Sequence, residues 1–392
     1  MGGENVGESK RIARLILRNR ALESLFERIP DIRKNPAIKL RAILMSLFLM
    51  PFFALTSLLS LDVEARTRRL KTLLASQRRM VASDTTFRRV LGWMDPRRIS
   101  EIPLRLLPHL ERARLLQHTL APGGPARRIG ILDGSFMGGH WLSALCLVGK
   151  IVLPAFFEPR RSQGNELAAS LSLLKRAKAC LGCSFPKLWL LDAFYFASPV
   201  FRRIRAMGAH LLIKMKDSEL RVVTKDAANL FAHFGGDSEA QGYDDNRLCR
   251  WLARQTLGSF AGFPVQVVQL TETYAKSRGN STVTCWIVTT DLSLSLYELR
   301  EAAHLRWQIE NNLFKRLSHL SGTKRFYFKD RRPFFNLLHI FAAAVALLDA
   351  FIHILRRHSG RFKAVLAGAK FTWISFFRLL AEQLEGLILF RS

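Results

Sequence analysis

The stretch RIGILDGSFM, Arg128–Met137, is an apolar run that carries one aspartate. At this point the spacing of apolar residues changes from helical to strand-like. Residues 141–150 (WLSALCLVGK) and 151–159 (IVLPAFFEP) are two more apolar segments with the length of short β-strands. Gly138 and Gly139 separate the first two segments, which predicts a hairpin. We therefore expect three consecutive strands at the centre of the chain.

The next segments alternate between helical and extended patterns. Residues 165–181 and 198–208 have apolar side chains at helical spacing, whereas 187–196 and 209–216 are apolar, strand-like runs. The order of three strands, helix, strand, helix and strand predicts an α/β fold for residues 127–216.

The rest of the chain divides into regions of different pattern. Residues 1–120 have helical spacing and end in a Pro/Gly-rich linker. Residues 217–295 are rich in strand and loop patterns, which predicts an inserted β subdomain. Helical spacing returns in residues 296–330 and continues through residues 331–392. The predicted fold class is α/β, with an inserted β subdomain and helical regions at both ends.

The charge of the chain predicts a polyanionic partner. Lysine and arginine number 60 against 31 acidic residues, and the net charge is +29. This excess is larger than solubility requires, and it favours nucleic acid ahead of anionic lipid. A strongly solvated arginine-rich surface is the alternative. The odd number of cysteines, 5, predicts no disulfide framework and fits a reducing cytoplasm.

The N-terminal region is rich in arginine and is predicted to bind DNA. Ser83 or Asp84 has the side chain of a helix N-cap, so Arg88 and Arg89 project from the helix that follows. Arginines on an exposed helix suit contacts with phosphates.

A membrane protein is one alternative reading. Ala42–Leu61 has no charged residue and is long enough to span a bilayer. Pro51 at its centre argues against a spanning helix. The only comparable stretch, Phe334–Leu355, contains His339 and Asp349, which favours a buried helix.

Two aspartates lie inside apolar strand-like runs. Asp133 lies in GILDGS and Asp192 in LWLLDAF. Burial of a carboxylate is costly unless it is paired or binds a cation, although a strand-end cap or turn is the alternative for each. On neighbouring strands, the two carboxylates would repel each other unless a divalent cation lay between them. Oxygen ligands favour Mg²⁺ or Mn²⁺.

A third carboxylate lies in HLRWQIENNLF, residues 304–314, which is predicted to be one helix. Arg306 and Glu310 are four residues apart and share a face of that helix. Glu310 borders the apolar stripe, so it can face the sheet. An ordinary surface ion pair is the alternative. The stripe consists of Ala302, Leu305, Ile309, Leu313, Leu317 and Leu320.

These blocks together resemble the bacterial insertion-sequence transposases of the DDE class, whose catalytic domain is ribonuclease H-like and shared with retroviral integrases. The resemblance covers most of the chain, and the long gap between Asp192 and Glu310 is typical of the subgroup with a β insertion. The matching blocks are TSLLSL (56–61), SDTTFRRVL (83–91), ILDGS (131–135), LLDAFYFASPVFRRIRAMGAHLLIKMK (190–216) and LRWQIENNLFKRL (305–317).

The third block departs from the signature of that subgroup. The signature is Tyr, two residues, Arg, three residues, Glu, six residues and Lys. Arg306 and Glu310 match it, but Ala303 replaces the tyrosine and Leu317 replaces the lysine. The catalytic carboxylates therefore match the signature of the subgroup better than the residues that would make accessory DNA contacts.

The resemblance implies a metal-dependent phosphoryl-transfer enzyme. Asp133, Asp192 and Glu310 are implied to be catalytic and to hold two Mg²⁺ ions, with Mn²⁺ as a possible substitute. The implied reactions are cleavage of DNA at the ends of a mobile element and strand transfer into target DNA. The implied partners are double-stranded DNA with terminal inverted repeats, target DNA and a second subunit, with no membrane. The implied location is the bacterial cytoplasm, associated with the nucleoid.

The same helix is implied to contact DNA. Arg306 would clamp a phosphate near the scissile bond, and Lys315 and Arg316 would contact the backbone. Trp307 would either stack on a displaced base or, as the commoner role of tryptophan, lie in the core. Two further readings stay open: a related nuclease that cuts without strand transfer, and a catalytically inactive DNA-binding protein descended from a transposase.

Overall fold

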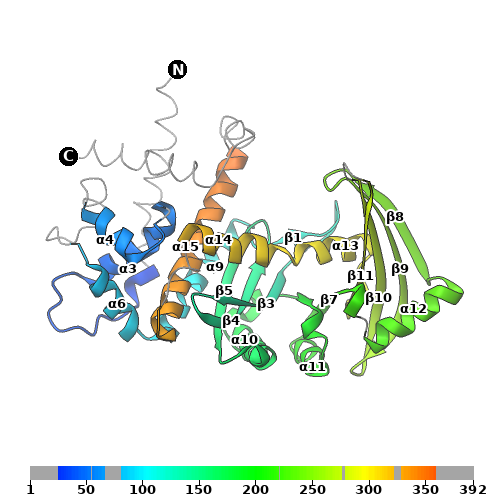
Figure 1. The fold of residues 1–392 in the computed structure, drawn as a ribbon, viewed down its shortest axis with the longest axis horizontal. Coiled ribbons are helices and arrows are strands. Elements are labelled where there is room, and N and C mark those ends of the chain that lie inside the picture. The colour runs from blue at the N-terminus through cyan, green and yellow to red at the C-terminus, as the bar shows by residue number, and fades with distance from the viewer. Residues whose placement is uncertain are drawn as a thin grey trace, which may run out of the picture.

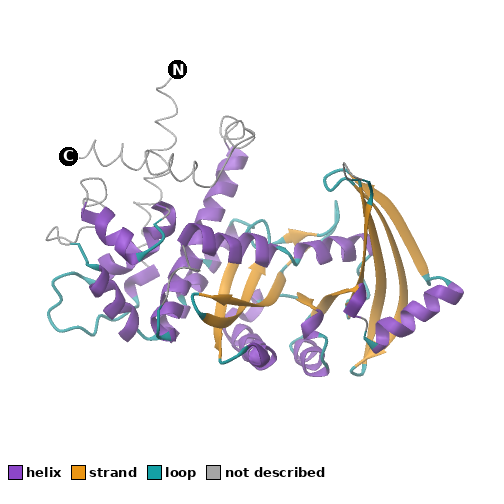
Figure 2. Cartoon of the chain, viewed as in Figure 1, coloured by secondary structure: helices purple, strands orange, loops and turns teal. Residues whose placement is uncertain are grey.

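The computed structural model describes residues 25–53, 55–66, 81–219, 221–275, 279–321 and 328–358. Over these residues the chain is a mixed α/β structure, in which one large sheet continues from a helical block to a strand-rich end (Figures 1 and 2). The first 24 residues, the arginines between 67 and 80 and the predicted helix break near Gly360 lie outside the described residues.

Nine strands form the main sheet, in the order β5-β4-β3-β6-β7-β11-β10-β9-β8. The pairs β3–β6 and β6–β7 are parallel, and all other neighbours are antiparallel. The strands are β3 (Ile129–Met137), β4 (His140–Val148), β5 (Val152–Arg160), β6 (Leu188–Asp192), β7 (His210–Lys216), β8 (Ser238–Asp244), β9 (Cys249–Phe260), β10 (Phe263–Tyr274) and β11 (Ser281–Thr289).

The predicted order of three strands, helix, strand, helix and strand is confirmed. Gly138 and Gly139 form the turn of the β3–β4 hairpin with positive φ angles of 56° and 84°, a conformation that glycine adopts readily. β6 is shorter than predicted, because a 3₁₀ turn, η4 (Ala193–Tyr195), begins directly after Asp192.

Residues 217–295 extend the central sheet instead of forming a sheet of their own. β11 pairs antiparallel with β7, and β10, β9 and β8 follow outward. The prediction also omitted α12 (Val222–Phe234), which packs against β9 and β10. Its buried side chains are Thr224, Ala227 and Phe231, whereas the apolar side chains of Val222 and Phe234 are exposed.

Helices cover both faces of the sheet. α10 (Glu166–Leu181) packs against β4 and β5, and α11 (Ser198–Ala206) packs against β7. α13 (Leu296–Leu305), the π-helix η6 (Ile309–Phe314) and α14 (Lys315–Ser321) lie on the opposite side, as Figure 1 shows. The contacts of η6 with β3 and β5 bring this segment over the aspartate strands.

The N-terminal helices pack around α15 (Arg331–His358). Over the described residues they are α3 (Leu40–Leu49), α4 (Leu58–Arg66), α6 (Asp84–Trp93), α7 (Pro96–Ser100), α8 (Ile102–Arg105) and α9 (Leu107–Arg112). The predicted N-cap Ser83 is confirmed, since its side chain accepts a hydrogen bond from Thr86 N. The Pro/Gly linker that follows connects the two strands of a short antiparallel ribbon, β1 (His118–Thr119) and β2 (Ala126–Arg127).

The apolar stretch Ala42–Leu61 is not a continuous helix. α3 ends at Leu49, and the 3₁₀ turn η1 (Met50–Phe53), which contains Pro51, follows it. Side chains such as Leu44 and Phe48 are fully buried. Among the described residues, one segment is long and apolar enough to cross a membrane by length and composition, Arg331–Ala350 of α15, and 89% of it is buried inside the protein. Both apolar stretches pack as core helices.

Candidate carboxylate site

Asp133 and Asp192 lie side by side on two parallel strands. β3 and β6 are paired in register up to Ile131 and Leu190. Two residues further along each strand, the same register brings Asp133 beside Asp192. The expectation that the two aspartate strands are neighbours in one sheet is confirmed.

Asp133 is buried and carries a strongly perturbed carboxyl group. The residue is 7% exposed, and its Oδ1 accepts a hydrogen bond of 2.8 Å from Gly134 N. Burial and the negative charge of Asp192 raise the pKa of Asp133 to about 7, and the positive charge of Arg306 partly opposes them. Near neutral pH, the ionised form of this carboxyl therefore depends on nearby positive charge.

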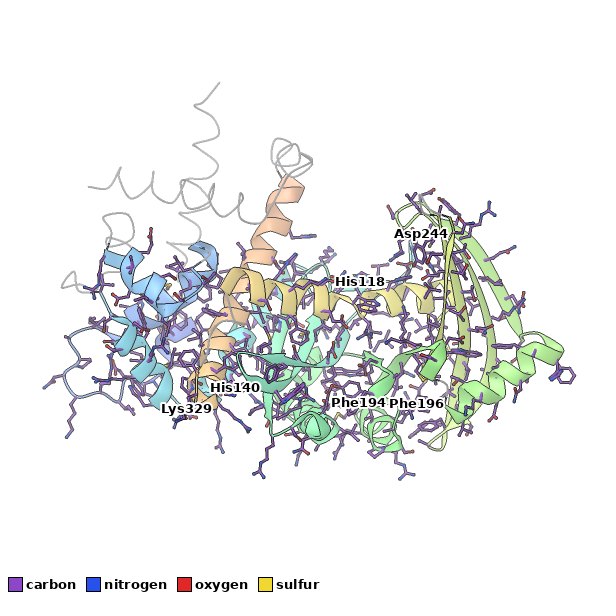
Figure 3. The ribbon with its side chains drawn as sticks, in the orientation of Figure 1. His118, His140, Phe194, Phe196, Asp244 and Lys329 are labelled. Carbon is purple, nitrogen blue, oxygen red and sulfur yellow. The ribbon has the colours of Figure 1, made fainter. Side chains whose placement is uncertain are left out.

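Asp192 is the last residue of β6 and is only partly buried. Its Oδ1 accepts a hydrogen bond of 2.9 Å from Phe194 N and thereby caps the 3₁₀ turn η4. The strand-end cap that the sequence left open is thus present, and it orients the carboxyl group beside Asp133. The Phe194 ring, labelled in Figure 3, is 49% exposed.

Glu310 lies in a π-helical segment, which corrects the prediction of one continuous helix over residues 304–314. α13 ends at Leu305, and η6 begins at Ile309 before α14 follows. A π-helix has a wider turn than an α-helix and often occurs at functional sites. The apolar spacing of the segment is compatible with both kinds of turn, so the sequence does not reveal this change.

Arg306 connects two of the three carboxylates. Its Nη1 lies 3.8 Å from Asp133 Oδ2, and its Nη2 donates a hydrogen bond of 3.3 Å to Glu310 Oε1. Arg306 is 7% exposed, so the alternative of an ordinary surface ion pair is wrong. Its Nε is buried and has no hydrogen-bond partner in the part of the chain that the structure describes. The guanidinium holds the Glu310 segment over β3.

A buried network supports β3 from the other face of the sheet, and the sequence analysis missed it. A Cβ atom at Gly134 would lie 2.3 Å from the Glu166 carboxylate, so glycine makes room for this side chain. Glu166 pairs with the buried Arg160 and accepts a hydrogen bond of 2.8 Å from the Tyr195 hydroxyl. These residues tie β5, α10 and η4 to the strand that carries Asp133.

A second buried network anchors α13, which leads to Arg306. Arg300 is 1% exposed, and its Nε donates a hydrogen bond of 2.7 Å to Glu272 Oε1 on β10. The same carboxylate oxygen lies 2.9 Å from His304 Nε2, and Asp244 at the end of β8 pairs with Arg300 at 2.9 Å. Figure 3 labels Asp244 at the strand-rich end. The extended sheet therefore determines where α13 lies.

The implied DNA contacts of the third block have different environments. Trp307 is 42% exposed and lies beneath the Arg306 guanidinium at 4.8 Å, so its expected core role is wrong. Lys315 is exposed and donates to Asn311 Oδ1. Arg316 is held in an ion pair with Asp349 of α15, which connects α14 to the helical block.

Arg88 and Arg89 are both exposed on α6, apart from the carboxylates. Arg88 pairs with Asp84 at 3.0 Å, four residues earlier, and stacks on Phe328 at 5.4 Å. No structural partner is found for the Arg89 side chain among the described residues.

The two positions that depart from the transposase signature lie in the core. Ala303 and Leu317 are both fully buried. A tyrosine or a lysine at these places would have to displace packed neighbours or bury a charge. The substitutions are therefore consistent with the packing of this chain.

The donor chemistry of the three carboxylates suits a hard divalent cation. All three side chains supply oxygen, and the negative charges of Asp192 and Glu310 both raise the pKa of Asp133. Among the described residues, no three His, Cys, Asp or Glu side chains stand close enough to form a ready-made metal cluster. Arg306 places a positive charge between Asp133 and Glu310.

Comparison with known proteins finds no matching family model and no matching curated protein. Among solved structures, the chain is similar to a piggyBac transposase determined as a synaptic complex with hairpin DNA. The identity is 9%, the TM-score is 0.42, and the match covers 98% of this chain and 81% of that one.

Proposed function

We propose that this protein is a DDE transposase with a ribonuclease H-like core, which binds the ends of a mobile DNA element and catalyses metal-dependent cleavage and strand transfer. The observation that carries the proposal is the placement of Asp133 and Asp192 on the paired parallel strands β3 and β6, with Glu310 linked to Asp133 through Arg306. The net charge of +29 supports DNA as the substrate.

The residues of the site have distinct proposed roles. Asp133, Asp192 and Glu310 would hold Mg²⁺, or Mn²⁺ in its place. The chemistry that two such ions supply is activation of water or of a DNA 3′-hydroxyl and stabilisation of the leaving oxygen at phosphorus. Arg306 would bind a phosphate of the substrate, and its unpartnered Nε supports this role. The exposed Trp307 ring would stack on an unpaired base.

A second candidate is a catalytically inactive DNA-binding protein descended from a transposase. The buried Ala303 and Leu317 favour it, because neither can make the DNA contact that the signature tyrosine and lysine imply. Both candidates predict binding to the terminal inverted repeats, most simply as a dimer that brings two ends together.

The decisive experiment incubates the full chain with Mg²⁺ and DNA that carries the flanking terminal inverted repeats. We expect nicking at the element ends and joining to target DNA. Glu310→Gln should abolish both, whereas Glu239→Gln, an exposed carboxylate on β8, should leave them unchanged. Binding without nicking or joining would favour the inactive protein, and cutting without joining would favour a nuclease. Equal activity of Glu310→Gln would refute the catalytic assignment.

A further inference from the structure

A pocket with a volume of about 480 Å³ lies at the edge of the sheet, outside the carboxylate site. It forms where α7, the end of β5, α10 and the start of α15 meet. Asp133 is paired with Ala144, and Ala144 is paired with Phe157 in the pocket wall. The pocket is therefore two strands, about 10 Å, away from Asp133 along the sheet.

Four arginines and a single glutamate surround this pocket. Arg97 and Arg331 are exposed, and their side chains have no ion pair among the described residues. Arg176 and Arg332 complete the set, and Glu158 lies 4.0 Å from Arg176. The excess of positive charge suits a phosphate, which arginine binds through several N–H donors at once.

Two of the four guanidinium groups are held in place by the protein. Arg176 donates a hydrogen bond to Ser100 Oγ. Arg332 donates to the backbone oxygens of Trp93 at 2.8 Å and Met94 at 3.0 Å. Guanidinium groups that are already oriented lose little conformational freedom when an anion binds.

A buried histidine in the pocket wall has an unused hydrogen-bonding atom. His339 is 3% exposed, and its Nδ1 donates a hydrogen bond of 2.7 Å to Phe335 O. Its Nε2 is buried and has no hydrogen-bond partner in the described part of the chain. Burial, with Arg176 nearby, lowers the pKa of His339 to about 4, so the ring is neutral and Nε2 is an acceptor. This nitrogen is available to accept a hydrogen bond from a donor group.

The remaining walls of the pocket are apolar and partly aromatic. Phe157 and Phe335 are buried there, and the Phe157 ring meets the His339 ring edge-on at 5.3 Å. Pro96 and Pro159 lie beside them. Aromatic and apolar walls bind a planar ring, and the volume is in the range of small-molecule sites.

We propose that this pocket binds a nucleoside phosphate. The arginines bind the phosphate, and the aromatic and proline side chains pack against the base and sugar. His339 Nε2 accepts a hydrogen bond from an amine or hydroxyl group of the ligand. The ligand is either a free mononucleotide or an unpaired nucleotide of a DNA strand. The proposal does not depend on catalysis at Asp133.

The test uses calorimetric titration of the full chain with dAMP, inorganic phosphate and deoxyadenosine. We expect dAMP to bind more tightly than either of its parts. Arg331→Gln should weaken dAMP binding about tenfold, because it removes one charged contact with the phosphate. Arg203→Gln, an exposed arginine on α11, should leave the affinity unchanged. His339→Leu should weaken dAMP but not inorganic phosphate, provided that its thermal unfolding matches the wild type.

Competition separates the two sources of the nucleotide. If a single-stranded oligonucleotide displaces dAMP and Arg331→Gln weakens both ligands, the pocket receives a nucleotide of a strand. If dAMP binds and the oligonucleotide does not displace it, the ligand is a free nucleotide. Undetectable dAMP binding, equal affinity of Arg331→Gln and wild type, or phosphate binding as tight as dAMP would overturn the proposal.

Discussion

At the scale of single residues, Asp133 shows how strongly neighbours determine the chemistry of a carboxyl group. It lies in an apolar strand beside Asp192, and burial with that second charge raises its pKa to about 7. Arg306 is the nearest compensating charge, at 3.8 Å. A metal ion binds the ionised form of a carboxyl group, so a cation beside Asp133 would favour ionisation of this side chain.

Asp133→Asn should stabilise the metal-free protein more at pH 8 than at pH 5. The folded pKa of about 7 exceeds the ordinary 3.8, so the folded state holds this proton more tightly than the unfolded state. The carboxyl therefore lowers the free energy of unfolding as pH rises from 3.8 to about 7, by at most about 4 kcal/mol. Urea unfolding with a chelator measures the difference.

The control for this experiment is Asp226→Asn, at an exposed position on α12. Its effect should be small and equal at both pH values. A gain for Asp133→Asn that does not grow between pH 5 and pH 8 would contradict the raised pKa.

At the scale of elements, the position of Glu310 depends on a helix that is fixed from a distance. α13 begins at a capping box, in which Ser295 and Glu298 satisfy each other's backbone N–H groups. Arg300 and His304 then hold it against Glu272 of the extended sheet. The spacing of the sequence revealed the helix but not the π-turn after it, which packs against β3 and β5.

Glu272→Gln should lower the free energy of unfolding by up to about 3 kcal/mol, because it removes one of the charged partners of the buried Arg300, which keeps Asp244 and Glu301. Denaturant unfolding measures this change. The matched control is Glu239→Gln, whose ion pair with Arg254 is exposed and contributes less than about 1 kcal/mol. A similar loss in both variants would show that the buried network does not anchor α13.

The Glu272 carboxylate makes the stability of the network that anchors α13 depend on pH. Burial alone would raise the pKa of Glu272, but hydrogen bonds and charges from His304, Tyr274 and Arg300 lower it to about 2. Because the folded pKa is below the ordinary 4.5, its contribution to stability is complete above pH 4.5 and is lost as pH falls towards about 2.

At the scale of the whole molecule, one sheet connects a helical block to a strand-rich end, and β3, which carries Asp133, lies between them (Figure 1). The net charge of the whole chain, +29, favours a negatively charged partner. Arginines such as Arg88 and Arg89 are exposed on the helical block. Under the proposed function, these arginines would contact phosphates of the DNA.

Binding to duplex DNA should weaken steeply with salt, because each phosphate contact releases counterions. Between 50 and 200 mM salt, we expect a loss of affinity of about a thousandfold or more if six or more phosphates are contacted. Arg89→Gln should lower the slope of log affinity against log salt by about one. Fluorescence anisotropy at several salt concentrations measures both, and a salt-independent affinity would contradict a phosphate-dominated interface.

The sequence by itself determined the α/β order of residues 127–216, the helical flanks as far as the structure describes them, and the two aspartates. The reason is that strand and helix periodicity and a carboxylate inside an apolar run are local signals. Only the tertiary structure decided that β11 joins β7, that Glu310 lies in a π-turn and that Arg306 lies between two carboxylates. It also decided that Glu166 lies beneath Gly134. These features depend on contacts between residues far apart in the chain, which no local pattern of side chains encodes.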